Sequence, residues 1–256
     1  MNEQIRICLE EFRKMYKLNE HEPIKNIFSI VDDSFLILKF PNKMGISGLF
    51  IEKKDRDKVF KCIYINTSEP RGRQNFSFAH ELYHVHFKKS TNGVCLIGDR
   101  EKEDVEKEAE MFASNLLIPR YTLLFDFKKF NLSSKTLLKE EHVFMLQRKY
   151  NVTFQSIIYA TEDMKKYAIY EKFYKFIPVI PKCFKKYFTS SWDKLKELSN
   201  QYNEDLDLNS PDSIYEFPEY FKRNLISSYE RGLTGFDELE EIFSFFNSEY
   251  ELKKYL

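Results

Sequence analysis

Two histidines four residues apart, in an apolar part of the sequence, constrain the fold more than any other feature of this chain. The segment reads His80-Glu81-Leu82-Tyr83-His84. Residues four apart lie on the same face of an α-helix, so both imidazoles can reach one metal ion at about 2.0 to 2.1 Å. Glu81 lies beside them by the same geometry. We therefore predict a helix over residues 74–88 that carries a metal-binding face.

The residues around this segment indicate that the helix is buried. The bare pattern also occurs on helices that bind no metal, so the surroundings decide between the two interpretations. Two imidazoles and a carboxylate without partners are costly in an apolar environment, which favours a metal. A catalytic zinc has three protein ligands and an open water position, and a neighbouring carboxylate takes the proton from that water. Glu81 is the candidate for this role. The apolar flanking residues are Phe76, Phe78, Ala79, Leu82, Val85 and Phe87.

A third ligand is expected from the acidic segment at residues 101–110. Helical spacing places Glu103, Glu106 and Glu110 on one face, and Glu106 is central, so it is the predicted ligand. Glu101 and Asp104 are better explained as a solvated helix start, which the helix dipole favours. The apolar stripe next to this face consists of Ala109, Phe112, Ala113 and Leu116.

Charge and cysteine content exclude several classes of protein. Lys plus Arg and Asp plus Glu number 40 each, so there is no overall positive charge to attract nucleic acid or a membrane surface. The four cysteines lie far apart and form no CxxC pair, which predicts reduced and mostly buried thiols. No stretch approaches about 18 uninterrupted apolar residues, and the amphipathic N-terminus is unlike a signal peptide. We therefore expect a cytoplasmic protein that does not bind membranes.

The order of the predicted elements indicates an α+β fold. A first helix is predicted over residues 3–17, a short helix over 24–30, and strands over 34–40, 46–53 and 59–66, the last two forming a hairpin. The metal-motif helix and the acidic helix follow. This order predicts a small sheet that backs the active-site helix.

Changes in composition suggest three parts. We predict a metallopeptidase-like domain at residues 1–128, a helical unit at 129–175, and a C-terminal region at 176–256. The last part begins with a stretch at 176–218 that contains four prolines and an Asn/Asp/Ser-rich span, which is typical of a linker or long loop. The aromatic-rich residues 167–188 are interpreted either as core or as a partner-binding surface.

Two linked motifs resemble the ImmA/IrrE family of zinc metallo-endopeptidases. The matching text is Asn75-Phe-Ser-Phe-Ala-His80-Glu-Leu-Tyr-His84, then Glu106-Lys-Glu-Ala-Glu-Met-Phe-Ala113 and Leu116-Leu-Ile-Pro119. The resemblance covers residues 1–120 best. It implies a zincin-like fold in which His80, His84 and Glu106 bind Zn²⁺ and Glu81 activates the water.

Two positions depart from the family pattern. Tyr83 replaces a usual Gly, so its phenol lies either near the metal or on the packing side of the helix. Glu110 replaces an Asn that is suited to a hydrogen bond with a ligand histidine, a bond that Glu can also accept. His86 is interpreted as a surface or hydrogen-bonded histidine, and His21 and His142 have no partners in the sequence that would suggest a site.

The resemblance implies cleavage of helix-turn-helix transcriptional repressors of phages, mobile elements or stress responses. Residues 140–160 resemble the small helix-turn-helix-like unit that follows the family's catalytic core, although an ordinary packed helical pair explains them equally well. We expect the substrate to add along an edge strand, with residues 46–53 as first candidate. The alternatives are a non-catalytic regulator that binds a repressor or DNA, and a purely structural zinc, although two histidines and one glutamate leave a coordination position open.

Overall fold

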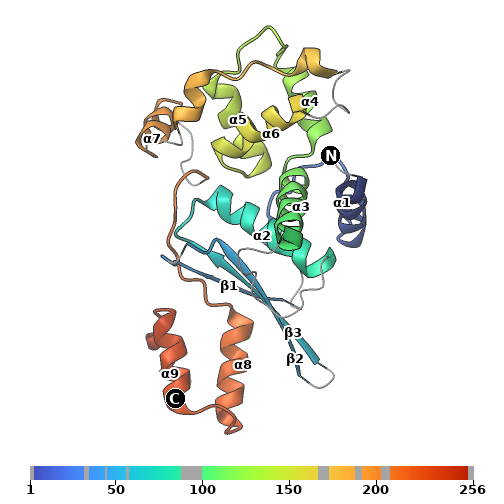
Figure 1. Ribbon diagram of the computed structural model, residues 1–256. Coiled ribbons are helices and arrows are strands. Elements are labelled where there is room, and N and C mark those ends of the chain that lie inside the picture. Colours follow the sequence, from blue (N-terminus) through green and yellow to red (C-terminus); the bar gives the residue numbers. More distant parts are fainter. Residues whose placement is uncertain are drawn as a thin grey trace.

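The computed structural model describes residues 3–31, 35–43, 45–55, 58–87, 100–166, 173–187, 192–202 and 208–252. Three layers of structure follow one another along the long axis of the molecule: a helical part, a central part built from the sheet with α1 to α3, and a pair of C-terminal helices (Figure 1). The elements are α1 Glu3–Met15, η1 Ile27–Ser29, β1 Phe35–Phe40, β2 Gly48–Asp55, β3 Lys58–Asn66, α2 Arg71–Phe87, α3 Arg100–Leu117, α4 Arg120–Lys129, α5 Glu140–Tyr150, α6 Phe154–Lys166, η3 Lys182–Tyr187, α7 Trp192–Gln201, α8 Glu219–Glu230, α9 Phe236–Phe245 and α10 Glu249–Leu252.

A three-stranded sheet forms the centre, in the order β1-β3-β2. β2 and β3 are antiparallel, which confirms the predicted hairpin, and β1 runs parallel to β3. β2 begins at Gly48, two residues later than predicted. The reason is Asn66, whose side-chain amide donates to the Ile46 carbonyl oxygen at 2.9 Å and so holds that residue in the bend before the strand. β2 is therefore an edge strand of the sheet.

Helix α2 packs on one face of this sheet, and α3 packs on α2 (Figure 1). Ile63 and Phe50 belong to the same buried core as Phe78 of α2 and Phe112 of α3. Alternation along β3 explains this packing, because every second side chain of a strand points to the same face. The arrangement confirms the predicted α+β fold with a sheet that backs the motif helix.

The helical part at residues 120–202 continues the same core. α5 and α6 are joined by three residues, and Asn151 at the start of this connection adopts the left-handed conformation with φ 52°. Phe144 and Phe154 pack edge to face with ring centroids 5.3 Å apart. Both rings belong to the cluster that contains the sheet and α2, so this unit packs directly on the central part. The division at residue 128 stays a prediction.

The stretch at 176–218 is only partly the linker or long loop that its prolines suggested, because residues 208–218 contain no helix or strand element whereas the earlier part is structured. Its described residues include η3 and α7, and the side chains of Ile177, Phe184, Leu195 and Leu198 lie in the main core. Prolines at positions 178 and 181 precede η3, where a fixed φ and a missing N–H are tolerated. Phe184 is buried, and Phe173 and Phe176 are partly buried against the core, which favours the core interpretation of the described aromatic residues.

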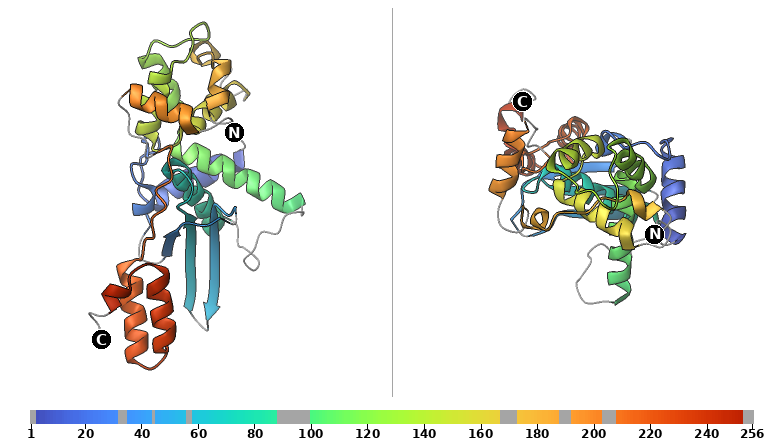
Figure 2. Two further views of the ribbon diagram at one scale, coloured as in Figure 1. Left: turned by 90° about the vertical axis from the view of Figure 1, so that its left-hand side faces the viewer. Right: turned by 90° about the horizontal axis from the view of Figure 1, so that it is seen from above.

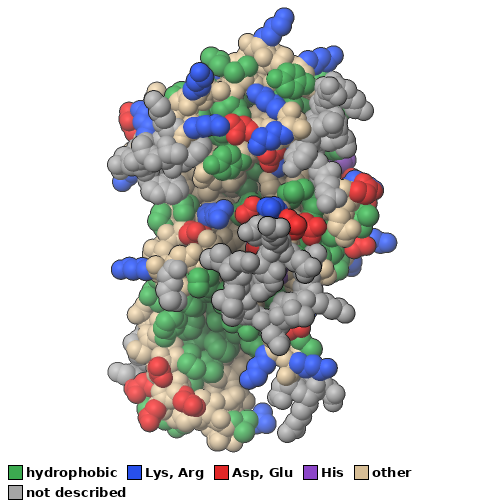
Figure 3. Space-filling view, viewed as in Figure 1, with side chains coloured by type: hydrophobic (Ala, Val, Ile, Leu, Met, Phe, Trp, Pro, Cys, Tyr) green, Lys and Arg blue, Asp and Glu red, His purple; other side chains and the backbone are tan. Residues whose placement is uncertain are grey.

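The C-terminal helices have a core of their own. Leu239 and Phe243 of α9 form its centre, and Leu38 and Phe40 of β1 contribute from the sheet face opposite α2. Phe40 meets the ring of Phe246 with centroids 6.2 Å apart. Figure 2 shows α8 and α9 side by side beside the hairpin. Acidic side chains gather on the outer face of α9 (Figure 3).

Among the described residues, Cys8 and Cys62 are buried free thiols, as predicted, whereas Cys183 is exposed. Cys95 lies outside the described residues. None of the described helices has the length and apolar character needed to cross a membrane.

Candidate metal centre

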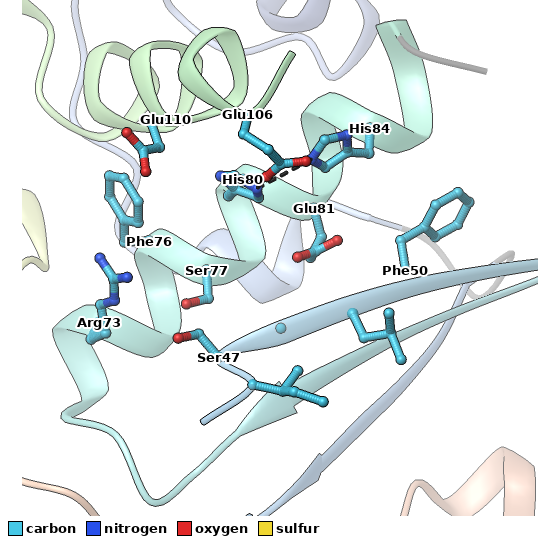
Figure 4. A pocket seen from close by; sticks show the side chains of 13 residues that line it. Ser47, Phe50, Arg73, Phe76, Ser77, His80, Glu81, His84, Glu106 and Glu110 are labelled. Carbon is cyan, nitrogen blue, oxygen red and sulfur yellow. Dashed lines mark hydrogen bonds and ion pairs between the residues drawn. The ribbon is translucent and has the colours of Figure 1, made fainter. Parts of the chain in front are cut away.

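The two motif histidines and Glu106 meet between α2 and α3 (Figure 4). His80 Nε2 lies 3.0 Å from Glu106 Oε2 and 3.1 Å from His84 Nε2, and His84 Nε2 lies 3.5 Å from Glu106 Oε1. These three residues form a group that could hold a metal ion within the described part of the chain. The structure thus brings together the three residues that the spacing and resemblance selected.

The spacing of these donor atoms fits a small metal ion. Ligands about 2.0 to 2.1 Å from a tetrahedral zinc lie roughly 3.3 to 3.4 Å from one another. The three separations at this site, 3.0, 3.1 and 3.5 Å, bracket that value. The chemistry agrees, because two imidazoles and one carboxylate leave a fourth position open.

Helix packing places Glu106 at this point. Ala109, Phe112 and Ala113 are fully buried, and they press α3 against α2 along the face predicted from helical spacing. The side chain of Glu106 remains 37% exposed because it faces a cavity of about 270 Å³. His80 and His84 also line this cavity, so the donor group is open to a ligand from outside.

Glu81 lies beside the donor group but outside it, on the side of β2 (Figure 4). The residue is 8% exposed and lines the same cavity. The pKa of Glu81 is raised to about 7, chiefly by burial and also by the charge of Glu106, against the opposing effects of His80 and the backbone N–H of Phe50. A carboxylate with a pKa near neutrality is suited to general acid–base work. The role of Glu81 as general base stays a prediction.

Gly48 makes the close approach of β2 to Glu81 possible, which the sequence reading missed. A methyl group at Gly48 would lie 3.0 Å from Glu81 Oε1 and 3.2 Å from Cγ. Such contacts would force the carboxylate to shift. Glycine within a strand often marks a close approach of this kind, and this signal was available in the sequence.

Tyr83 and Glu110, the two residues that depart from the family pattern, lie in different environments. Tyr83 is 1% exposed and lies on the packing side of α2, where its hydroxyl donates to Glu108 Oε2 at 2.7 Å and its ring packs 5.4 Å from that of Phe112. It does not line the metal cavity. Glu110 lines the cavity but is exposed, and the described residues show no hydrogen bond from it to either histidine. The expected contact with a ligand histidine is thus absent.

His86 is a hydrogen-bonded histidine, as interpreted from the sequence. Its Nε2 lies 2.9 Å from the hydroxyl of Tyr16. Burial, with Lys61 nearby, lowers the pKa of His86 to about 4, so the ring is neutral at pH 7. The side chain of Glu103, the other acid on the predicted face of α3, lies outside the described residues.

Further cavity residues were not selected from the sequence. Ser47 precedes β2, and on α2 Arg73 lies two turns and Ser77 one turn before His80. Single serines and arginines carry no spacing signal, so only the fold shows that they share a cavity with His80.

Fold and site together define a metallopeptidase-like domain, in which a buried carboxylate and three side chains that could hold a metal ion line one open cavity. Residues 40–162 match the IrrE N-terminal-like domain of the M78 peptidase family. This match confirms the resemblance to the ImmA/IrrE family over these residues. The match begins later and ends later than the range 1–120 over which the resemblance was best, and it includes α5 and α6. No curated protein matches the chain.

Metal content tests the assignment of Glu106. Glu106→Ala removes one of three donors, so the purified full chain is expected to lose most of its bound zinc after dialysis against buffer of low zinc concentration. Glu103→Ala and Glu110→Ala remove acids from the same predicted face and are expected to retain it. The zinc-to-protein ratio is measured by atomic emission. An undiminished ratio in Glu106→Ala would place the third ligand elsewhere.

Proposed function

We propose that this chain is a zinc-dependent endopeptidase that hydrolyses a peptide bond in a protein substrate. The observation that carries the proposal is the position of Glu81, a buried carboxylate beside His80, His84 and Glu106 in one open cavity. A structural zinc site is closed by four protein ligands, whereas two histidines and one carboxylate with space beside them are typical of a catalytic site.

Zinc is the ion that this donor set favours. Imidazole nitrogen together with one carboxylate is a common zinc combination, whereas magnesium and calcium prefer oxygen ligands alone. His80, His84 and Glu106 would hold the ion. When bound, zinc supplies Lewis-acid chemistry to the carbonyl and the attacking water.

Glu81 performs the proton transfers in this proposal. Its carboxylate accepts a proton from water as the water oxygen forms a bond to the scissile carbonyl carbon. The protonated Glu81 then donates that proton to the amide nitrogen as the carbon–nitrogen bond breaks. The products are one free carboxyl group and one free amine. A pKa raised by burial helps Glu81 to take part in both steps.

The substrate backbone is proposed to bind along the edge strand β2. β2 is at the edge of the sheet, and Gly48, Leu49 and Phe50 line the metal cavity. An extended peptide can add to such an edge through main-chain hydrogen bonds. The scissile bond then lies between β2 and α2, where Glu81 faces it.

We propose a helix-turn-helix repressor as substrate, on the strength of the family resemblance. A cytoplasmic location is part of this proposal, because such repressors act on chromosomal DNA. Direct binding of DNA is disfavoured, because the chain has no net positive charge and the two acids of α6, Glu162 and Asp163, balance its two lysines. The helical pair α5–α6 is better explained as packing on the peptidase core.

Cleavage of a neighbouring repressor tests the function. The full chain, loaded with zinc, is mixed with the helix-turn-helix repressor encoded next to its gene, and products are followed by mass spectrometry. We expect two fragments, their loss on chelation, and their return when zinc is restored. Tight repressor binding or salt-sensitive DNA retention with no fragments would support the non-catalytic alternative instead.

A further inference from the structure

A second cavity of about 720 Å³ continues from the metal cavity. Both are lined by Arg73, Phe76 and Glu110, so these three residues form the junction between them. The second cavity extends between α3 and α6, which contribute Ser114 and Tyr159 among others. A peptide that extends from the metal centre past these three residues would reach the second cavity.

Carboxylates dominate the charged residues of this second cavity. Four acids and two bases line it. Three of the acids have cationic partners. The pairs are Glu69–Arg73, Glu162–Lys185 and Asp163–Lys166, with N–O distances of 3.9, 2.8 and 3.7 Å.

Glu110 is the remaining acid, and among the described residues it has no ion pair or hydrogen bond. It is exposed at the junction, and Figure 4 shows Phe76 between it and Arg73. The Arg73 guanidinium lies 5.1 Å from the centroid of the Phe76 ring. Nearby, Glu69 Oε2 is buried without a hydrogen bond. The junction therefore offers an unpaired carboxylate and an aromatic ring to whatever passes through it.

The position of Glu110 limits which residues of a bound peptide it can contact. Glu110 follows Glu106 by four residues, about 6 Å along the α3 axis. An extended peptide advances about 3.3 Å per residue. The side chain that reaches Glu110 therefore belongs to a residue within about two positions of the bond at the metal centre.

We propose that Glu110 is a specificity-determining residue that selects a lysine or arginine within two residues of the scissile bond. The inference rests on the proposed peptidase function, and it names the class of sequence that this site cuts. A cationic side chain donates a charge-assisted hydrogen bond to Glu110 and gains contact with the Phe76 ring, whereas an acidic side chain is repelled by the Glu110 carboxylate.

Cleavage of a peptide mixture tests the inference. The zinc-loaded full chain is incubated with peptides of diverse sequence, and cut bonds are identified by mass spectrometry. We expect Lys or Arg to be enriched within two positions of the cut bonds. For a cut peptide and its Lys→Gln counterpart, Glu110→Gln should lower kcat/KM for the first by about tenfold and leave the second unchanged. Glu110→Lys should favour peptides with Asp or Glu at that position.

Asp104→Asn is the matched control, because it neutralises an exposed carboxylate on α3 that lines neither cavity. It should leave the preference unchanged. Cut bonds without enrichment, or equal effects of Glu110→Gln on both peptides, would overturn the inference and leave the peptidase intact. If the wild-type chain cuts nothing, the peptidase proposal fails. Fluorescence anisotropy then compares the binding of one Lys peptide and its Gln counterpart, and equal affinity would overturn the selection of basic side chains as well.

Discussion

Replacing Glu81 by glutamine is expected to abolish repressor cleavage while zinc stays bound. Glutamine has nearly the same shape but cannot accept a proton from water, and a positioned general base contributes about 10²- to 10⁴-fold to a rate. The donor group of His80, His84 and Glu106 does not include Glu81, so metal content should remain that of the wild-type chain. Cleavage rate and zinc content are measured on the same preparation.

His80→Ala is the companion variant, because it removes a donor atom and should lose both zinc and cleavage. Glu81→Gln should also fold normally. Its neutral amide does not carry the cost of burying a charge, which raises the pKa of the carboxylate. Cleavage at the full wild-type rate by purified Glu81→Gln would contradict the mechanism. Loss of zinc in that variant would mean that Glu81 takes part in metal binding.

Local periodicity was sufficient to predict the metal helix and its partner. The spacing of His80 and His84 depends only on helix geometry, and the apolar stripe around Phe112 identified which face of α3 would meet α2. Both inferences concern residues within one or two helical turns. The structure brings Glu106 to the histidines as that spacing indicated.

Contacts between distant elements were beyond the reach of such patterns. The approach of β2 to α2 at Gly48 depends on the sheet, and the sequence offered only a glycine within a strand. Glu110 was expected to contact a ligand histidine because it stands one turn from Glu106, yet it is exposed at the junction with a second cavity that α6 helps to form. Tyr83 could have faced the metal or the core, and Glu108 and Phe112 on α3 give it partners on the core side.

Composition misled in the first part of the stretch at 176–218, whereas residues 208–218 are the irregular connection that it predicted. Proline, asparagine and serine favour turns, but side chains such as Leu195 and Leu198 have enough apolar surface to pack α7 on the main core. Burial of such side chains contributes about 1.5 to 3 kcal/mol each, which exceeds the local preferences of neighbouring residues. Tertiary packing therefore decides the structure of the described part of this stretch.

Gly72→Ala is expected to destabilise the chain by about 3 kcal/mol or more, although alanine is the better helix former by roughly 1 kcal/mol. Gly72 lies in the first turn of α2. An added methyl group would lie 2.5 Å from the Thr153 nitrogen, 2.6 Å from the Val152 carbonyl carbon and 2.9 Å from the Leu208 oxygen. All three are main-chain atoms, so no side chain can rotate away to relieve the clash.

The clash would separate α2 from the segments that close over its first turn. The Gly72 nitrogen donates to the Leu208 oxygen at 3.1 Å, and the α5–α6 connection passes on the other side. Gly235→Ala is the matched control, because its added methyl group would meet only Glu238 Oε2, at 4.0 Å, and its expected cost is below about 1 kcal/mol. Urea unfolding followed by circular dichroism compares both variants with the wild-type chain. If Gly72→Ala unfolds at the same urea concentration as the wild-type chain, the helical part does not pack on α2 as closely as these distances require.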